Sequence, residues 1–151
     1  MDDRAEHPPL PDGVSIGAAT AGDVAELLAL WAAAAENDAR PADTAQAVLA
    51  MLERDPGACL VARHSGRIVG SLIAGWDGWR AHLYRLAVDP AMRRQGIARA
   101  LLEAAAARLR ALGATRLDAM VLEGNELGQA LWRGSGYAPQ PEWRRWVKPS
   151  S

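Results

Sequence analysis

Apolar residues follow two different periods in the middle of this chain, which predicts a strand that leads into a long helix. From Ile97 onward, apolar side chains recur at positions 97, 101, 105, 109 and 112, the spacing of one helix face. Residues 81–88 have the composition of a strand, and Asp89-Pro90 ends it because proline favours extended geometry in the residue before it. Gly113 stands where a helix C-cap belongs.

The remaining apolar runs predict a mixed α/β (α+β) fold with antiparallel hairpins. Ser65-Gly66 and Asp77-Gly78 are typical of the tight turns that join neighbouring strands. The expected strands cover residues 14–18, 58–63, 67–74, 81–88 and 115–122, with two more near Tyr137 and over 143–147; the expected helices cover 20–37, 43–54, 97–112 and 125–133. Residues 1–13 are rich in proline, so we expect a flexible tail before a single domain over 14–151.

The composition narrows the class of protein. With 151 residues, half of them hydrophobic, the chain is long enough to bury about two-thirds of its surface. A net charge of −1 gives no reason to expect binding to nucleic acid or to an anionic membrane. The lone Cys59 lies in an apolar run, as a core residue does. The acidic, proline-rich start differs from a signal peptide and no apolar run is long enough to span a membrane, so we expect a cytoplasmic protein, monomer or homodimer.

The start of the 97–112 helix is a candidate anion site. A helix N-terminus has free N–H groups and partial positive charge, and Gly96 and the small Ala98 let a phosphate approach the backbone. Arg93 and Arg94 add two cations beside it. A pyrophosphate fits this arrangement, although any amphipathic helix can begin with basic residues and a glycine. The Walker lysine motif and the G-x-G-x-x-G motif are both missing, so ordinary nucleotide-binding folds fit poorly.

Two motifs resemble those of the GCN5-related N-acetyltransferase family. The segment Arg93-Arg-Gln-Gly-Ile-Ala98 matches the family's [QR]-x-x-G-x-[GA] motif, and Leu86-Ala-Val-Asp-Pro90 before it looks like the family's fourth strand and turn. Downstream, the order Glu123-Gly-Asn125, Ala130-Leu-Trp132 and Gly136-Tyr137 resembles the second motif, in which an asparagine precedes a helix and a closing Gly-aromatic pair. The resemblance covers roughly residues 14–138.

This resemblance implies a largely antiparallel sheet flanked by helices, in which the fourth and fifth strands separate. The pantetheine of acetyl-CoA, or of another acyl-CoA, then enters the gap like an extra strand, and no metal is expected. Asn125 is expected near the pantetheine; capping its own helix is the simpler role, and both roles can hold together. The residues expected to hold the cofactor are Leu86, Ala87, Val88, Arg93, Arg94, Gln95, Gly96, Ile97, Ala98, Arg99, Asn125 and Trp132.

The chemistry needs a base for the amine and a proton for the leaving thiolate. His82 is the best-placed base, because it lies six residues before Val88, where histone-acetylating members of the family have a glutamate; histidine's ordinary pKa of about 6.5 suits the task. A simple strand histidine is the alternative. Tyr84 shares its face by strand alternation, and Glu123 is a second candidate base. Trp132 stands where many members have the tyrosine that protonates the thiolate, and indole is not an acid, so the proton source stays open.

The acceptor is the least defined part of this prediction. By analogy with the family, the pocket uses the first two helices and the loop before the fourth strand, with candidate residues Trp31, Glu36, Trp76 and Trp79. The two later tryptophans either contact a cationic substrate through cation–π interaction or pack their own hairpin. We expect an N-acyltransferase acting on a primary amine of a small molecule or peptide. A catalytically weak acyl-CoA-binding module is the alternative, and a structural subunit without cofactor binding is disfavoured by the intact motif.

Overall fold

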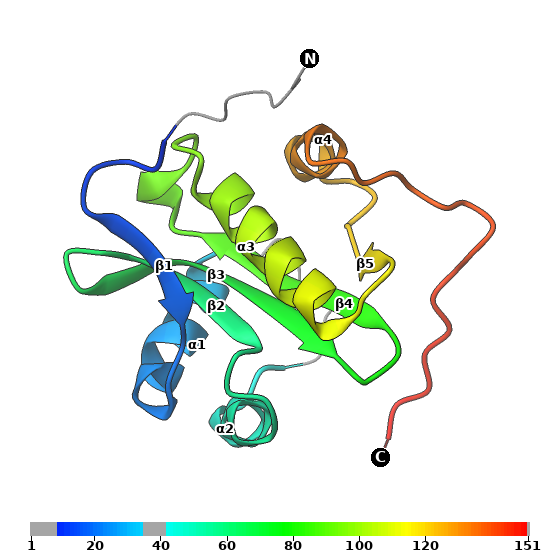
Figure 1. Ribbon diagram of the computed structural model, residues 1–151, viewed down its shortest axis with the longest axis horizontal. Helices are drawn as coiled ribbons and strands as arrows, with labels where there is room; N and C mark the ends of the chain where they lie inside the picture. The colour runs from blue at the N-terminus through cyan, green and yellow to red at the C-terminus, as the bar shows by residue number, and fades with distance from the viewer. Residues whose placement is uncertain (1–8, 35–41, 151) are drawn as a thin grey trace. The chain divides into compact units, whose positions relative to one another are not determined.

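The computed structural model describes residues 9–34 and 42–150 (Figure 1). The chain divides into two compact units, Met1–Met120 and Val121–Ser151. Its strands are β1 (Val14–Ala18), β2 (Cys59–His64), β3 (Arg67–Trp76), β4 (Ala81–Val88) and β5 (Leu117–Ala119); its helices are α1 (Val24–Ala33), α2 (Ala45–Arg54), α3 (Ile97–Leu112) and α4 (Glu126–Gly134), with short 3-10 helices η1 (Ala21–Asp23) and η2 (Pro90–Met92). The expected mixed fold is confirmed. The single domain over 14–151 stays a prediction.

The first unit is built on one sheet whose strands follow the chain order β1-β2-β3-β4-β5. The first four strands pair antiparallel, and β4 and β5 pair parallel over three residues, from Ala81–Leu117 to Leu83–Ala119. Both predicted turns lie at the hairpins, and Ser65, Gly66 and Gly78 have the positive φ angles that tight turns require. Local turn chemistry therefore explains why β2, β3 and β4 are neighbours in the sheet.

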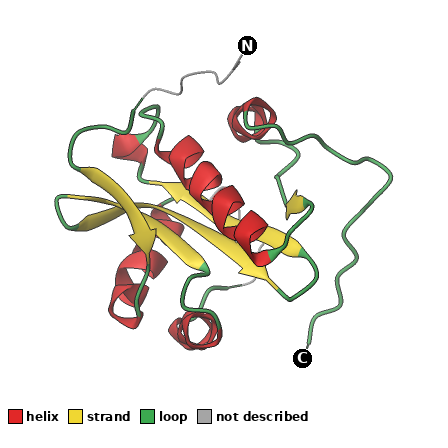
Figure 2. Cartoon of the chain, viewed as in Figure 1, coloured by secondary structure: helices red, strands yellow, loops and turns green. Residues whose placement is uncertain are grey.

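Helices cover the two faces of this sheet (Figure 2). Neighbouring residues of β3 show which helix lies on which face, because side chains alternate along a strand. A Cβ at Gly70 would lie 3.0 Å from Ile97 and 3.2 Å from Leu101, so this position faces α3 at close approach. The next residue, Ser71, accepts a hydrogen bond from Trp31 of α1. The sheet therefore lies between α3 on one face and α1 with α2 on the other.

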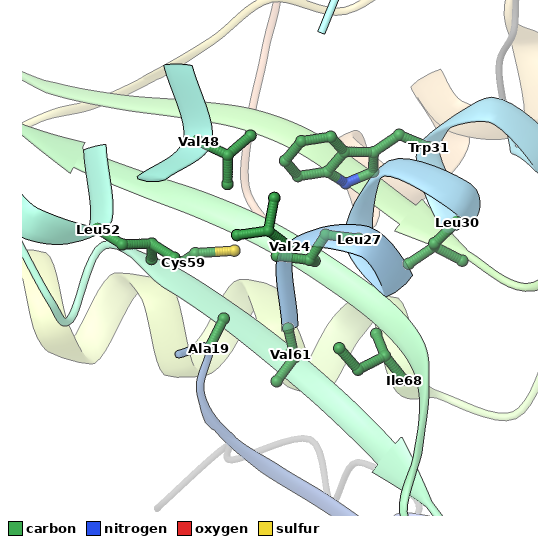
Figure 3. Packing of buried hydrophobic residues seen from close by; sticks show 10 residues of the cluster. All are labelled: Ala19, Val24, Leu27, Leu30, Trp31, Val48, Leu52, Cys59, Val61 and Ile68. Carbon is green, nitrogen blue, oxygen red and sulfur yellow. The ribbon is translucent and has the colours of Figure 1, made fainter. Parts of the chain in front are cut away.

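The core beneath α1 and α2 combines aliphatic side chains from both helices with residues of β2 and β3 (Figure 3). Its members are Ala19, Val24, Leu27, Leu30, Trp31, Val48, Leu52, Cys59, Val61 and Ile68. Cys59 is fully buried, as expected of a core residue, and burial raises the pKa of its thiol to about 12. Ile73 of β3 and Ala87 of β4 pack against this core, which positions the strand that carries the candidate site.

The C-terminal part departs from the expectation. The two strands predicted near Tyr137 and over 143–147 are not formed: the described residues after α4, 135–150, contain no helix or strand. Trp143 and Trp146 are 75% and 95% exposed, so these side chains gain no burial that would stabilise a strand. Pro139 and Pro141 also lack the N–H groups that a strand ladder needs. The fifth strand is likewise shorter than expected, covering 117–119 rather than 115–122.

Candidate functional site

The loop between β4 and α3 has the backbone shape of an anion site. Asp89 caps η2 by accepting a hydrogen bond from the N–H of Ala91 at 2.9 Å. Arg94 and Gly96 then both adopt positive φ, at 63° and 81°, and Gly96 is the N-cap of α3. The first backbone hydrogen bond to this N-cap comes from the N–H of Ala100, which donates to the carbonyl of Gly96 at 3.0 Å. The amides before it belong to the first turn, where a helix offers N–H groups to a ligand.

The surroundings of Gly96 are open and cationic. A Cβ built there would meet nothing within 4 Å, so the chain itself leaves the space beside this backbone empty. Arg93 and Arg94 are exposed around the same loop, while Ile97 is buried and anchors the helix on the sheet. Because the left-handed conformation favours glycine and the free space admits an anion, Gly96 suits both the fold and phosphate binding.

Part of the β4 edge next to the loop has no paired strand among the described residues. Within the described residues, β5 pairs with β4 only as far as Leu83, so residues 84–88 have no strand on that side. On the other side, the N–H of Asp89 donates to the carbonyl of Val69 at 2.8 Å. Backbone groups alternate between the two edges of a strand, so those of Leu86 and Val88 point to the unpaired edge. This is the arrangement that strand addition requires.

A bulge interrupts β4 at the start of this open edge. The pairing of β4 with β3 shifts by one residue between Ser71–Ala87 and Ile73–Tyr84, and Arg85 has φ of 52°. Buried Ser71 donates its hydroxyl to the carbonyl of Arg85 at 2.9 Å. The Arg85 guanidinium bonds Asp43 just before α2, at 2.6 Å and 3.0 Å. None of these three residues is among the predicted site residues, although a polar serine within an apolar strand is one signal of this contact.

His82 and Tyr84 lie together on the face that carries α1 and α2. Their ring centroids are 6.0 Å apart, so the expectation that they share a face is confirmed. His82 is half-buried and stands opposite Gly75 in β3 and Asp118 in β5, while Tyr84 is 43% exposed. A Cβ at Gly75 would lie 3.5 Å from the Tyr84 ring, so the ring lies next to this position of β3. The pair is accessible to a substrate.

The second unit contains Glu123, Asn125 and Trp132. Asn125 caps α4, accepting a hydrogen bond from the N–H of Gly128 at 2.9 Å, so its capping role is confirmed. Trp132 is 9% exposed and meets Tyr137 edge-on, with ring centroids 4.9 Å apart. Glu123 is exposed in the turn before the helix. Contact of Asn125 and Trp132 with a cofactor stays a prediction.

The three expected acceptor residues that the structure describes do not form one cluster. Trp31 is 2% exposed and donates its Nε1–H to the hydroxyl of Ser71 at 2.8 Å, so it is a core residue and its predicted place in a substrate pocket does not fit this burial. Trp79 is 78% exposed, and the guanidinium of Arg80 lies 4.6 Å from its ring centroid, so this cation–π contact forms within the hairpin. Trp76 is half-buried, and Glu36 lies outside the described residues.

Asp77 organises that hairpin turn. Its Oδ1 accepts hydrogen bonds from the backbone N–H groups of Arg80 at 2.7 Å and Trp79 at 2.8 Å. These two bonds, the one from Arg80 first, hold the pKa of the Asp77 carboxyl below its ordinary value. Among the described residues, no group of three His, Cys, Asp or Glu side chains is placed to hold a metal ion, and no helix there is both long and apolar enough to cross a bilayer.

Comparisons with known proteins agree with this geometry. The model of the acetyltransferase (GNAT) family matches residues 23–137. An acetyltransferase of Yersinia enterocolitica is 39% identical over 89 residues, covering 59% of this chain and 63% of that protein, so the chain spans less than two thirds of that relative's length. A ribosomal-protein-alanine N-acetyltransferase from Brucella melitensis has a TM-score of 0.68 at 28% identity, covering 81% of this chain and 83% of that one. YncA from Salmonella typhimurium, solved with its cofactor acetyl-CoA, has a TM-score of 0.72 at 21% identity over 84% and 80% of the two chains, a likeness of fold.

Proposed function

The chain belongs to the acetyltransferase (GNAT) family, and from that premise we propose that it transfers an acetyl group from acetyl-CoA to a primary amine of a small molecule or peptide. The observation that carries the proposal is the open, left-handed turn at Arg94 and Gly96, which leads into the N-terminus of α3 beside an unpaired strand edge. A diphosphate and an extended amide-bearing arm, the two parts of coenzyme A, match these two features in order.

The cofactor residues divide into two groups by chemistry. The amides that open α3, with Arg93 and Arg94, would bind the pyrophosphate through charge-assisted hydrogen bonds of about 1.5–3 kcal/mol each. The carbonyl of Leu86 and the backbone of Val88 would pair with the pantetheine amides at the open edge of β4. When bound by these residues, acetyl-CoA would supply the acetyl group as a thioester.

His82 is proposed to accept the proton of the incoming amine, directly or through water. The amine nitrogen bonds to the acetyl carbon, the carbon–sulfur bond breaks with its electron pair on sulfur, and the amine proton passes to the base. Support comes from the accessible pairing of His82 with Tyr84, at 6.0 Å between rings. A positioned base contributes about 10²–10⁴-fold to such a rate. Tyr84 would donate the proton to the thiolate, and Glu123 is the alternative base.

Release of free CoA from acetyl-CoA across a panel of alkylamines and peptide amines tests this function. We expect His82→Ala to lower kcat/KM by about 10²-fold or more and to remove one ionisation from the acid limb of the pH profile. Glu123→Gln is the control, because it removes the second candidate base. Loss of the acid limb in Glu123→Gln with an unchanged profile in His82→Ala would assign the base to Glu123.

An acyl-CoA-binding module without strong catalysis is the second candidate. The observation that favours it is Trp132, which has no ionisable hydroxyl and packs edge-on against Tyr137. Tight acetyl-CoA binding with no CoA release on any amine of the panel would favour this second candidate over the transferase.

A further inference from the structure

We propose that Ser71, oriented by Trp31, is a positioning residue that directs the N–H of Leu86 toward the acyl carbonyl at the open edge of β4. The inference rests on the acetyl transfer proposed above and names two residues that act on it from inside the core. Neither side chain reaches the surface: Ser71 is 0% exposed and Trp31 is 2% exposed.

The direction of this hydrogen-bond chain is fixed by chemistry. The indole Nε1–H of Trp31 can only donate, so Ser71 accepts that bond at 2.8 Å. The carbonyl of Arg85 can only accept, so the serine proton must go to it, at 2.9 Å. Because the indole occupies one side of the serine oxygen, the hydroxyl is held in the rotamer that reaches Arg85. Trp31 therefore sets the orientation of a hydroxyl 40 residues away in the sequence.

The carbonyl that receives this proton controls an amide at the site. The Arg85 carbonyl and the Leu86 N–H belong to one planar peptide unit and point in opposite directions. When Ser71 holds the carbonyl on the side of α1, the N–H of Leu86 is turned away from it. Strand alternation from the Asp89–Val69 bond likewise places the backbone of Leu86 at the unpaired edge. A preorganised N–H aimed at a carbonyl is worth most when it cannot rotate.

The bulge needs this support. Arg85 has a backbone φ of 52°, which residues other than glycine and asparagine rarely adopt. Two contacts hold it there: the buried bond from Ser71 to its carbonyl and the ion pair of its guanidinium with Asp43. Without the serine, an ordinary β conformation at Arg85 would rotate the peptide and move the Leu86 N–H off the edge.

Three variants test this hydrogen-bond chain from Trp31 through Ser71 to Arg85, called the relay below: Ser71→Ala, Trp31→Phe and the double variant. The matched control is Leu109→Ala, which removes a fully buried side chain of α3 on the other face of the sheet and has no contact with the relay. The measurements are kcat for acetyl transfer, the Kd of CoA without the acetyl group, and the amide resonance of ¹⁵N-labelled Leu86 in the ligand-free protein.

We expect Ser71→Ala to lower kcat roughly 10- to 100-fold, because one carbonyl donor loses its alignment. Its Kd for CoA should change by no more than about twofold, since the phosphates bind at α3. Trp31→Phe should lower kcat in the same sense, and the double variant should fall no further than Ser71→Ala, because the two residues act in one chain. The Leu86 resonance should shift in both single variants and stay in place in Leu109→Ala.

Two results would overturn the inference and separate it from the function. If the wild-type protein transfers acetyl groups and Ser71→Ala keeps its kcat and its Leu86 resonance, as Leu109→Ala does, then Ser71 is a structural residue only. If the wild-type protein releases no CoA on any amine, then the proposed function fails, and the positioning role fails with it.

Discussion

Two substitutions of Gly96 should rank in opposite order for folding stability and for CoA affinity: Gly96→Glu should be at least as stable as Gly96→Gln but should bind CoA more weakly. Gly96→Gln and Gly96→Glu add side chains of equal size at φ of 81°, and neither meets an atom within 4 Å at Cβ. Both should therefore lose about 1–2 kcal/mol of stability from the left-handed backbone alone. The Glu variant should regain about 0.3–1 kcal/mol, because a negative charge at a helix N-terminus is favourable. In urea unfolding, Glu should thus be at least as stable as Gln.

Affinity for CoA should follow the reverse order. Two like charges 4 Å apart repel by about 1 kcal/mol in water and about 4 kcal/mol at a protein surface, and each 1.4 kcal/mol is tenfold in Kd. We therefore expect Gly96→Glu to bind CoA about 10- to 100-fold more weakly than Gly96→Gln by calorimetry at low salt. The gap should narrow at 0.5 M NaCl, where charges are screened within a few ångströms. Equal CoA affinity of the two variants at both salt concentrations would refute a phosphate site at this helix start.

Three further outcomes are expected. Trp132→Ala should lower acetyl-CoA affinity or stability; if only packing is lost, the free energy of unfolding should fall by about 3–5 kcal/mol. Trp132→Tyr should keep turnover. Normal stability and normal acetyl-CoA affinity in the alanine variant would contradict the alignment of the second motif. The side-chain hydrogen bond from Arg63, at 2.6 Å, lowers the pKa of Asp23, so the stability that this pair contributes is present above pH about 4 and lost on acidification; Asp23→Asn should flatten that acid limb in thermal unfolding. The raised pKa of Cys59, about 12 against 9.0 for a free thiol, means that only the unfolded chain ionises it between these values, so stability should fall as pH rises above 9, and Cys59→Ala should remove this dependence.

Local signals in the sequence predicted the parts of the site that local chemistry determines. The backbone at Gly96, before α3, lies beside open space, as expected where a phosphate is to approach it, and Gly113 is the predicted C-cap, with φ of 111°, at the other end of the same helix. His82 and Tyr84 share a face because strand alternation depends only on the neighbouring residues. These features need no knowledge of distant contacts.

Distant contacts account for what the sequence did not reveal. Trp31 is an aromatic residue on an apolar helix, and nothing local decides whether it faces a pocket or the core. Its partner Ser71 is 40 residues away, and Arg85 meets Asp43 over a separation of 42 residues. The prediction of C-terminal strands was wrong for a related reason. Trp143 and Trp146 are residues that favour strands, but both are exposed. The intrinsic propensity of these residues favours a strand, but a strand becomes stable only when its side chains are buried against neighbouring elements.

The bulge in β4 did leave one trace in the sequence. The apolar residues Ala81 and Leu83 are two apart, as a strand face requires, but the next ones that face α3 are Leu86 and Val88, after a step of three. Val88 stands opposite Gly70, whose Cβ direction meets α3, so the face before and after the step is the same. An odd step on one face of a strand requires an extra residue, and a bulge supplies it. The same extra residue turns the Arg85 carbonyl toward Ser71, so the break in the hydrophobic pattern and the proposed orientation of the Leu86 amide have a single cause.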